Sequence, residues 1–532
     1  MSESCVVFCS RLRKSPVCKI PLSSFRWRVG TGPKNGRFFN PAEKTVCTIA
    51  VCGSGRMDVS MVFSSLIFLY LFLPVCLILY FVARKMKVKN IILLVLSLLF
   101  YAWGEPVWVI LLIFSGFVDY FNGRIIEANR GTKYAKMALI ASIVINLGLL
   151  GVFKYSAFFI QSINGLFSAH LPFAEFALPI GISFYTFQTL SYTIDVYRGN
   201  TKAQMKFSNF LLYVSLFPQL IAGPIVRYTD VAEQIDNRTT TLSGFKNGAI
   251  RFLTGLAKKV LIANYAGSVC QQLLSSNLSE LTTAGAWFGI FLFAVQIYFD
   301  FSGYSDMAIG LGKIFGFAYP ENFNYPYICT SITDFWRRWH ISLSSFFRDY
   351  VYIPLGGNRR HLVLNLLIVW SLTGLWHGAS WNFVLWGLYY FVFLFFEKVI
   401  LKGKMGQMPW YVKRPYSLLV VLIGWAFFYF TDLGQLGTFF QSFFFASPNG
   451  LIDTTSQTII INNSLFAAIA VIACLPLSKY VKKLVNYVGQ QKGNAGMAVQ
   501  FSLNFVYMAG VLFFCTASLV GQSYNPFLYF RF

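Results

Sequence analysis

The stretch LVLNLLIVWSLTGLWHGASWNFVLWGLYYFVFLFF, residues 362–396, carries no Lys, Arg, Asp or Glu. As one straight helix it would be about 52 Å long, because each residue adds about 1.5 Å, whereas the hydrocarbon core of a bilayer is about 30 Å thick. The stretch must therefore break into two membrane-embedded segments. We expect the break within LWHGASWN at 375–382, where Gly378 and Asn382 interrupt the apolar pattern.

The rest of the chain has the same character. Of its 532 residues, 56% are hydrophobic and 12% are charged, about half the charged fraction of soluble domains. Further uncharged runs cover 61–83, 137–153, 176–194, 207–226, 281–299, 415–431, 454–478 and 493–530. Since one span needs about 20 apolar residues, we predict an all-α polytopic membrane protein with about eleven to thirteen transmembrane or re-entrant helices and with amphipathic interfacial helices. A β-barrel would instead show short segments of alternating polarity.

The net charge of +24 raises the question of a nucleic-acid partner. The basic residues, however, gather in short stretches at 84–89, 398–414 and 479–492, between apolar runs. Basic short loops mark the cytoplasmic face of a membrane protein. We therefore expect the lipid bilayer, not nucleic acid, as the partner of this charge, with Met61 and the C-terminus on the opposite side.

Residues 1–60 do not fit this pattern. They contain ten Lys and Arg, five of the ten cysteines and no apolar span. They lack the apolar core of a signal peptide, and their cysteines lack the paired spacing of a zinc site. We interpret 1–60 as a mis-assigned or disordered extension upstream of a start at Met61, with a cysteine-rich domain as the alternative. Residues 61–532 form one membrane domain, in which the other cysteines are expected to pack in the interior.

Four histidines occur in the chain. His170 lies between apolar segments and His361 lies in a basic loop, and we expect both side chains at the membrane interface or in solvent. His377 follows about 22 Å of apolar helix that begins at Leu362. An ionisable residue so deep in a membrane is a functional hypothesis by default. The alternative is a structural histidine that binds a carbonyl freed by the break.

His340 lies in DFWRRWHISLSSFFRDYVYIPLGGNRR, residues 334–360. The aromatic and apolar residues from Phe335 to Phe347 recur at helical spacing, which predicts an amphipathic helix along the bilayer surface. Asp334 is the expected N-cap, and IPLGG at 353–357 the expected end. His340 alone would be read as part of an interfacial anchor.

No metal motif, phosphate loop or Ser-His-Asp order appears in the chain. A partly desolvated histidine is suited to act as a general base on a hydroxyl or a thiol. The pattern therefore favours acyl transfer in the membrane without a metal. A transporter or flippase is the competing class, although it would more typically show inverted repeats, and a non-catalytic scaffold is a third.

Several long motifs point further. WRRWHISLSSFFRDYVYIPLGGNRR and SLTGLWHGASWNFVLWG, together with LPIGISFYTFQTLSYTIDVYRG, FPQLIAGPIVRY and QIYFDFSGYSDMAIGLGKIFGF, extend over nearly all of 61–532. They resemble the membrane-bound O-acyltransferase (MBOAT) superfamily, and within it the bacterial alginate O-acetyltransferase branch, which is related to the D-alanyl transfer protein of teichoic acid modification.

The resemblance implies that His377 is the catalytic histidine and that His340 is the second histidine of the site. It implies an acetyl group taken from a cytoplasmic thioester, acetyl-CoA, with no tightly bound cofactor, and passed across the bacterial inner membrane. The acceptor would be an extracytoplasmic polysaccharide such as alginate, with a separate extracytoplasmic acetyltransferase as partner. D-alanyl or another acyl group transferred to a cell-envelope polymer is the alternative.

Further polar and aromatic residues near these motifs are candidates for the substrate tunnel. The carboxylates among them are costly in a membrane, and the arginines suit an anionic donor. A helix-packing network or contact with lipid phosphate explains the same residues as well. The candidates are Arg337, Arg338, Asp300, Ser302, Tyr304, Asp306, Trp376 and Asn382.

Overall fold

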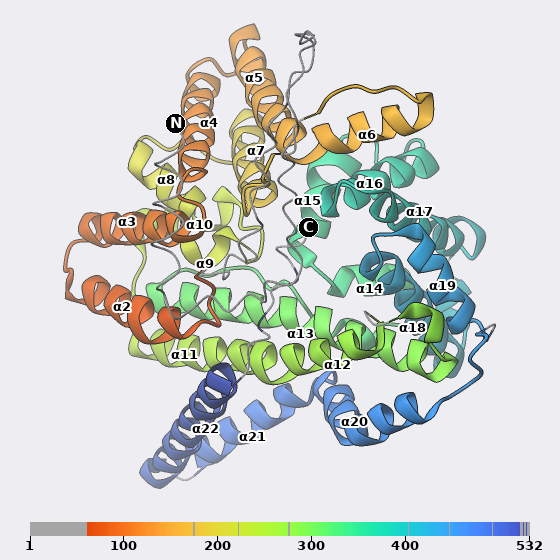
Figure 1. Cartoon of the computed structure of the whole chain (residues 1–532). Coiled ribbons are helices and arrows are strands. Elements are labelled where there is room, and N and C mark those ends of the chain that lie inside the picture. The colour runs from red at the N-terminus through yellow and green to blue at the C-terminus, as the bar shows by residue number, and fades with distance from the viewer. Residues whose placement is uncertain are drawn as a thin grey trace, which may run out of the picture. The chain divides into compact units, whose positions relative to one another are not determined.

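The computed structural model describes residues 61–532, except 174–175, 222, 275–276, 403, 446, 492, 522–524, 526–527 and 529–532. Within this part of the chain the regular elements are all helices (Figure 1). The predictions for residues 1–60, including their five cysteines, lie outside the described residues. The five cysteines of the described part, Cys76, Cys270, Cys329, Cys474 and Cys515, are free and buried, as expected.

The helices follow one another along the chain in three groups, with η marking π- and 3₁₀-helices. The first group is η1 (Phe68–Phe72), α2 (Leu73–Val82), α3 (Met86–Gly104), α4 (Val109–Ala128), α5 (Lys133–Leu150), η2 (Gly151–Tyr155), α6 (Ser156–Phe167), α7 (Ile182–Arg198), α8 (Phe207–Ser215), α9 (Phe217–Leu220) and α10 (Tyr228–Asn237). The second group is α11 (Leu242–Ala257), η3 (Lys258–Ala263), α12 (Asn264–Leu274), η4 (Leu278–Glu280), α13 (Thr283–Phe315), η5 (Pro326–Ile328), α14 (Ile332–Arg338), α15 (Ile341–Phe347) and η6 (Arg348–Tyr352). The third group is α16 (Leu362–His377), α17 (Trp381–Phe395), η7 (Phe396–Ile400), η8 (Lys404–Gln407), α18 (Trp410–Tyr429), α19 (Leu433–Phe443), α20 (Thr454–Ala473), α21 (Leu477–Gln491) and α22 (Gly493–Gly521).

Seven helices of the described part are long and apolar enough to cross a bilayer, which confirms a polytopic all-α membrane fold. They are Met86–Gly104, Val109–Ala128, Lys133–Phe167, Thr283–Phe315, Trp381–Ile400, Thr454–Ala473 and Ala495–Gly521. Two shorter apolar helices are Phe68–Val82 and Leu362–His377. The expected runs at 176–194 and 207–226 form the shorter helices α7, α8 and α9 instead, whose side chains are mostly buried.

The 33-residue helix α13 is the core of the described part, and 78% of its membrane-spanning window is buried. It packs along α11 and α12, which run beside it (Figure 1). A helix that is apolar on all sides is stable when protein surrounds it. By contrast, only 6% of the spanning window of α22 is buried, so its apolar side chains are left to face lipid.

Helices α16 and α17 form a tight hairpin, and the break expected within 375–382 is confirmed. Two glycines allow the close approach. A methyl group on Gly374 would collide with the backbone carbonyl of Phe383, and one on Gly387 with that of Trp370. The hairpin tip therefore has a fixed place relative to both helices, and His377 is the last residue of α16.

Candidate active site

The segment around His340 differs from the single surface helix that the pattern predicts. It forms two short helices, α14 and α15, with Trp339 extended and His340 in the left-handed region at φ 44°. The expected end at 353–357 is confirmed, because the chain turns there. Most of the aromatic residues are buried against protein instead of lying on a surface. Helical spacing predicted the buried face but not the break, because only a small share of non-glycine residues adopt the left-handed region.

The N-cap of α14 is Ser331, not Asp334. The Ser331 hydroxyl accepts a hydrogen bond from the Asp334 N–H at 2.9 Å, and the Asp334 carboxylate accepts one from the Thr330 N–H at 3.2 Å. Asp334 thus occupies the third helical position of a reciprocal cap. The other capping group comes from far along the chain, since the Glu397 carboxylate accepts from the N–H groups of Ile332 and Thr333 at 2.6 and 2.9 Å.

Asn322 holds the break between α14 and α15. Its backbone carbonyl accepts from the Ile341 N–H at 3.0 Å. Its side-chain Oδ1 accepts from the Ser342 N–H at 3.2 Å and from the Ser342 hydroxyl at 2.9 Å, and lies 3.2 Å from Nδ1 of His340. The Asn322 Nδ2 donates to Ser305 of α13 at 3.2 Å. Asn322 and His340 are both buried, so this amide supplies partners that water cannot supply.

These contacts favour one tautomer of His340, whose Nδ1 also lies 3.4 Å from the Ser342 hydroxyl. The backbone N–H of Ser342 is a donor only, so the Asn322 atom that faces it must be the carbonyl oxygen. An oxygen of this kind only accepts hydrogen bonds, so Nδ1 of His340 carries the proton and donates to it. Nε2 then keeps its lone pair. It is buried and has no hydrogen-bond partner among the described residues.

His377 projects from the last turn of α16 into an aromatic enclosure. Its ring lies 4.9 Å from the ring of Trp386 and 5.2 Å from that of Phe428, measured between centroids. The side chain is 6% exposed, and its Nδ1 has no hydrogen-bond partner within the described part of the chain. A buried ring nitrogen without a partner is costly, so it marks a place where a ligand atom would be stabilised.

Trp376 brings the two histidines together. Its ring lies 4.9 Å from the ring of His377 and 6.0 Å from the ring of His340. It also packs at 5.7 Å against Phe184 and Phe187 of α7. The two histidines, 37 residues apart in the sequence, therefore contact one indole in the protein interior.

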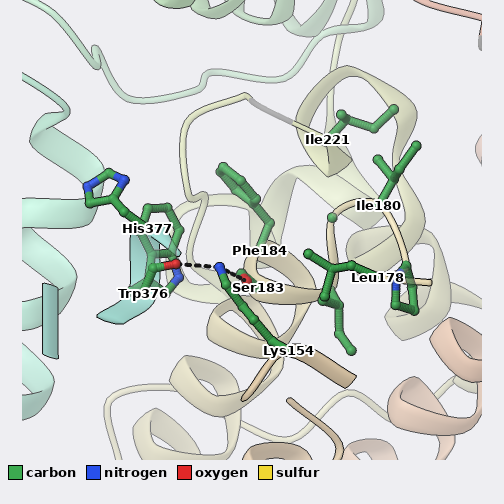
Figure 2. A pocket seen from close by; sticks show the side chains of 11 residues that line it. Lys154, Leu178, Ile180, Ser183, Phe184, Ile221, Trp376 and His377 are labelled. Carbon is green, nitrogen blue, oxygen red and sulfur yellow. Dashed lines mark hydrogen bonds between the residues drawn. The ribbon is translucent and has the colours of Figure 1, made fainter. Parts of the chain in front are cut away.

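Lys154 is a site residue that sequence reasoning missed. It lies in the π-helical turn η2, inside the continuous helical segment Lys133–Phe167. Its Nζ donates to the backbone carbonyl of Trp376 at 2.5 Å and to the Ser183 hydroxyl at 3.3 Å (Figure 2). The neighbouring Tyr155 hydroxyl donates to the carbonyl of Leu375 at 2.8 Å. Two consecutive side chains of η2 thus bind two of the terminal carbonyls of α16.

A small pocket adjoins this contact. Its volume of about 60 Å³ holds roughly four water molecules. Most of its wall is apolar and comes from 178–184 and Ile221, and Lys154, Ser183 and His377 add polar groups. Figure 2 shows the Lys154 amine between Ser183 and the Trp376 carbonyl, with the imidazole of His377 pointing away from it. The pocket therefore adjoins the Trp376–His377 backbone, to which the Lys154 amine is bound.

Comparison with known proteins identifies the class of enzyme. Residues 201–431 match the model of the MBOAT, membrane-bound O-acyltransferase family. The probable alginate O-acetylase AlgI of Azotobacter vinelandii is 38% identical over 507 residues, which cover 89% of this chain and 100% of that relative. The chain belongs to the MBOAT family. It is a multi-pass membrane O-acyltransferase.

Two further relatives of this MBOAT protein have names that refer to other polymers. The peptidoglycan O-acetyltransferase of Helicobacter pylori is 36% identical, and the alignment covers 62% of this chain and 68% of the relative. The teichoic acid D-alanyltransferase of Bacillus subtilis is 29% identical, with 55% of this chain and 74% of the relative covered.

In the MBOAT structure the two carboxylate candidates of α13 each form ion pairs with basic side chains. Asp300 forms a buried ion pair with Lys259 at 2.6 Å and accepts from the Leu528 N–H at 2.9 Å. Asp306 pairs with Arg251 at 2.5 Å and with Lys258 at 2.7 Å. Both carboxylates thus bind α13 to neighbouring segments, as the helix-packing alternative predicts.

Ser302 and Tyr304 are buried in the same helix, and Tyr304 stacks on Phe63 with centroids 4.5 Å apart. The MBOAT site reaches α13 through two other residues. Phe301 places its ring 4.6 Å from that of His340, and Ser305 binds Asn322. Both lie within the FDFSGYSD motif, so the sequence pointed to the right motif, but other residues of it were chosen as candidates.

The remaining candidates of the MBOAT protein differ in their burial and in their partners. Asn382 is fully buried next to the hairpin tip, where its amide donates to the Phe427 carbonyl at 3.0 Å. Arg338 pairs with Asp334 at 2.8 Å, and Arg337 is exposed. His170 and His361 are exposed, as expected. No group of three or more His, Cys, Asp or Glu residues that could hold a metal ion occurs among the described residues.

Proposed function

We propose that this acyltransferase moves an acetyl group from cytoplasmic acetyl-CoA to a hydroxyl group of an extracytoplasmic polysaccharide, in a bacterial inner membrane. The observation that carries the proposal is the pair of buried histidines that share Trp376 as a neighbour. Nε2 of His340 and Nδ1 of His377 are both buried without partners in the described part of the chain. An imidazole with an available lone pair takes the proton of an attacking hydroxyl.

The proposed reaction balances without a metal or a redox partner. The acceptor hydroxyl oxygen attacks the carbonyl carbon of the thioester, and His377 takes the hydroxyl proton. The new C–O bond forms, the C–S bond breaks, and the coenzyme A thiolate takes a proton back from the histidine. His340 accepts a hydrogen bond at Nε2 and holds the reacting hydroxyl or thiol in line. A general base of this kind contributes about 10²–10⁴-fold in rate.

The ends of the hairpin support an orientation of the site in the membrane. The α16–α17 hairpin begins after Arg359 and Arg360 and ends beside Lys398, so both of its open ends are basic. Basic ends face the cytoplasm. His377 lies at the other end of α16, about 22 Å along the helix axis. The small pocket lies at the start of α7, because residues 178–181 precede that helix and 182–184 form its first turn, whereas Arg198 ends it.

The relatives support the choice of acyl group and acceptor. Relatives at 38% and 43% identity carry the name probable alginate O-acetylase AlgI, and a teichoic acid D-alanyltransferase at 29% identity is less similar. We infer an acetyl group and a uronate polysaccharide such as alginate, with acetyl-CoA as a passing substrate in place of a bound cofactor. A separate extracytoplasmic acetyltransferase is the proposed partner at the outer face, while the reaction above needs only this chain, acetyl-CoA and the acceptor hydroxyl.

The test uses the full chain in proteoliposomes with acetyl-labelled acetyl-CoA and an alginate oligosaccharide on opposite sides. We expect labelled ester on the oligosaccharide with wild type, and a loss of at least about 10²-fold with His377→Ala and with His340→Ala. His361→Ala is the matched control, because this exposed histidine begins the same helix that His377 ends. Transfer at the wild-type rate by folded His377→Ala protein would refute the proposed base.

A further inference from the structure

Lys154 is an unusual residue for its place in the chain. It is the only Lys, Arg, Asp or Glu between Met137 and Phe167, within a helical segment long and apolar enough to span the membrane. Its side chain is 9% exposed. An ionisable side chain in such a segment is expensive and is retained for a function by default.

The main contact of Lys154 is with the backbone that carries His377. The carbonyl of Trp376, which accepts from Nζ of Lys154, belongs to the peptide group that joins Trp376 to His377. It is also one of the last four carbonyls of α16, which have no partner inside the helix. A cation at a helix C-terminus is favourable because the carbonyl dipoles point toward it.

A plain packing role does not explain the choice of lysine. No Asp or Glu lines the pocket beside it, and no ion pair of Lys154 occurs among the described residues. Tyr155 shows that a neutral hydroxyl is sufficient to bind an adjacent terminal carbonyl. The π-helical turn that directs both side chains toward α16 is itself a feature that recurs at functional sites.

We propose that Lys154 is a positioning residue for acyl transfer. It holds the Trp376–His377 peptide group against η2 and Ser183, and thereby sets where the imidazole of His377 and the indole of Trp376 stand relative to His340. The proposal rests on the proposed function, because it assigns Lys154 to the same reaction. Displacing a reacting group by about 1 Å costs on the order of 10²-fold in rate, so a small movement of this peptide group is enough to be measured.

The test compares Lys154→Met with wild type in the acetyl-transfer assay. Methionine keeps most of the length and the apolar stem but cannot donate a hydrogen bond or carry charge. We expect kcat to fall on the order of 10²-fold, with the KM for acetyl-CoA within about threefold and the melting temperature in detergent within a few degrees. Lys154→Arg keeps a cationic donor beside the pocket and is expected to recover at least tenfold over the Met variant.

Tyr155→Phe is the matched control, because it removes the neighbouring bond to the same helix end without removing a charge. We expect its kcat within about threefold of wild type. A kcat of Lys154→Met within threefold of wild type would overturn the proposal. Equal losses of kcat and melting temperature in Lys154→Met and Tyr155→Phe, or an Arg variant no better than Met, would also overturn it, since a structural role alone would then suffice.

A second variant keeps the test decisive when the Met variant does not accumulate. Lys154→Gln has an uncharged and shorter side chain, and its kcat is likewise expected to fall on the order of 10²-fold. Wild-type kcat in that variant would overturn the proposal. Wild-type protein that transfers no acetyl group counts against the proposed function, whereas active wild type with an equally active Lys154 variant counts against this inference alone.

Discussion

Replacing Asn322 by Ala tests whether the environment of His340 is what makes it reactive. The amide of Asn322 is fully buried and makes four contacts, with Ser342 N–H, Ser342 Oγ, His340 Nδ1 and Ser305 Oγ. Alanine keeps the backbone bond to Ile341 but removes all four. The change therefore removes the group that fixes both the tautomer and the ring orientation of His340.

The cost in stability follows from these contacts. Side-chain hydrogen bonds contribute on average about 0.6 kcal/mol each in a membrane protein and about 1 kcal/mol in water-soluble proteins. Four contacts give about 2–4 kcal/mol. The left-handed backbone of His340 adds a further reason for loss, because such strain persists only when the surroundings hold it. We expect kcat/KM for acetyl transfer to fall about 10–100-fold at a temperature where the variant is folded.

Thermal unfolding in detergent measures the first effect, and the proteoliposome assay the second. Ser305→Ala is the control, since Ser305 binds only the far side of the Asn322 amide and leaves the bond to His340 in place. It should lose about 1 kcal/mol or less and keep most of its activity. An Asn322→Ala protein with wild-type melting temperature and wild-type kcat/KM would contradict the tautomer argument.

Three other changes test the framework around the site. Gly374→Ala places a methyl group against the backbone of α17 and should cost about 1–3 kcal/mol by thermal unfolding, whereas Gly437→Ala, with open space around it, should cost nothing measurable. Lys259→Met leaves the carboxylate of Asp300 buried without its cation and should cost about 3–5 kcal/mol, most of which a double variant with Asp300→Leu should recover. Burial raises the pKa of Asp349, but hydrogen bonds from two arginines outweigh this effect and hold the pKa below its usual value. The stability that Asp349 contributes is therefore present above about pH 4 and is lost as the pH falls through the folded-state pKa. Asp349→Asn should flatten the pH dependence of the melting temperature in that range.

The membrane class and the hairpin break were predictable from composition and length. A run much longer than a bilayer is thick has to turn, and glycine with asparagine marks the place. The number of spans was harder to predict. Segments such as 182–198 are apolar enough to count as membrane-embedded but carry Thr, Ser and Gln on several faces, and α7 is buried by protein instead of lipid. Polarity along one helix does not show what surrounds it.

The site was predictable only in part. His377 could be found from depth alone, and His340 from its resemblance to a family motif. Asn322 had no signal of its own, because a single Asn in a loop is common, and Ser305 lay in a motif from which other residues were chosen as candidates. Lys154 did carry a signal. The uncharged run 137–153 ends at this lysine, although the apolar pattern continues to Phe167. Treating the lysine as the middle of a longer span would have marked it as a buried charge.

The helix breaks at the site and the polar residues around them have one physical cause. Lipid offers no hydrogen bonds, so each backbone group freed by a break must find a partner within the protein. The end of α16 is bound by Lys154 and Tyr155, the start of α14 by Glu397, and the turn at His340 by Asn322. These partners come from distant parts of the chain. The imidazoles are thus positioned by breaks that are stable only when these segments are packed together, so we expect the loss of Lys154 or Asn322 to lower the rate of acyl transfer even at temperatures where the protein stays folded.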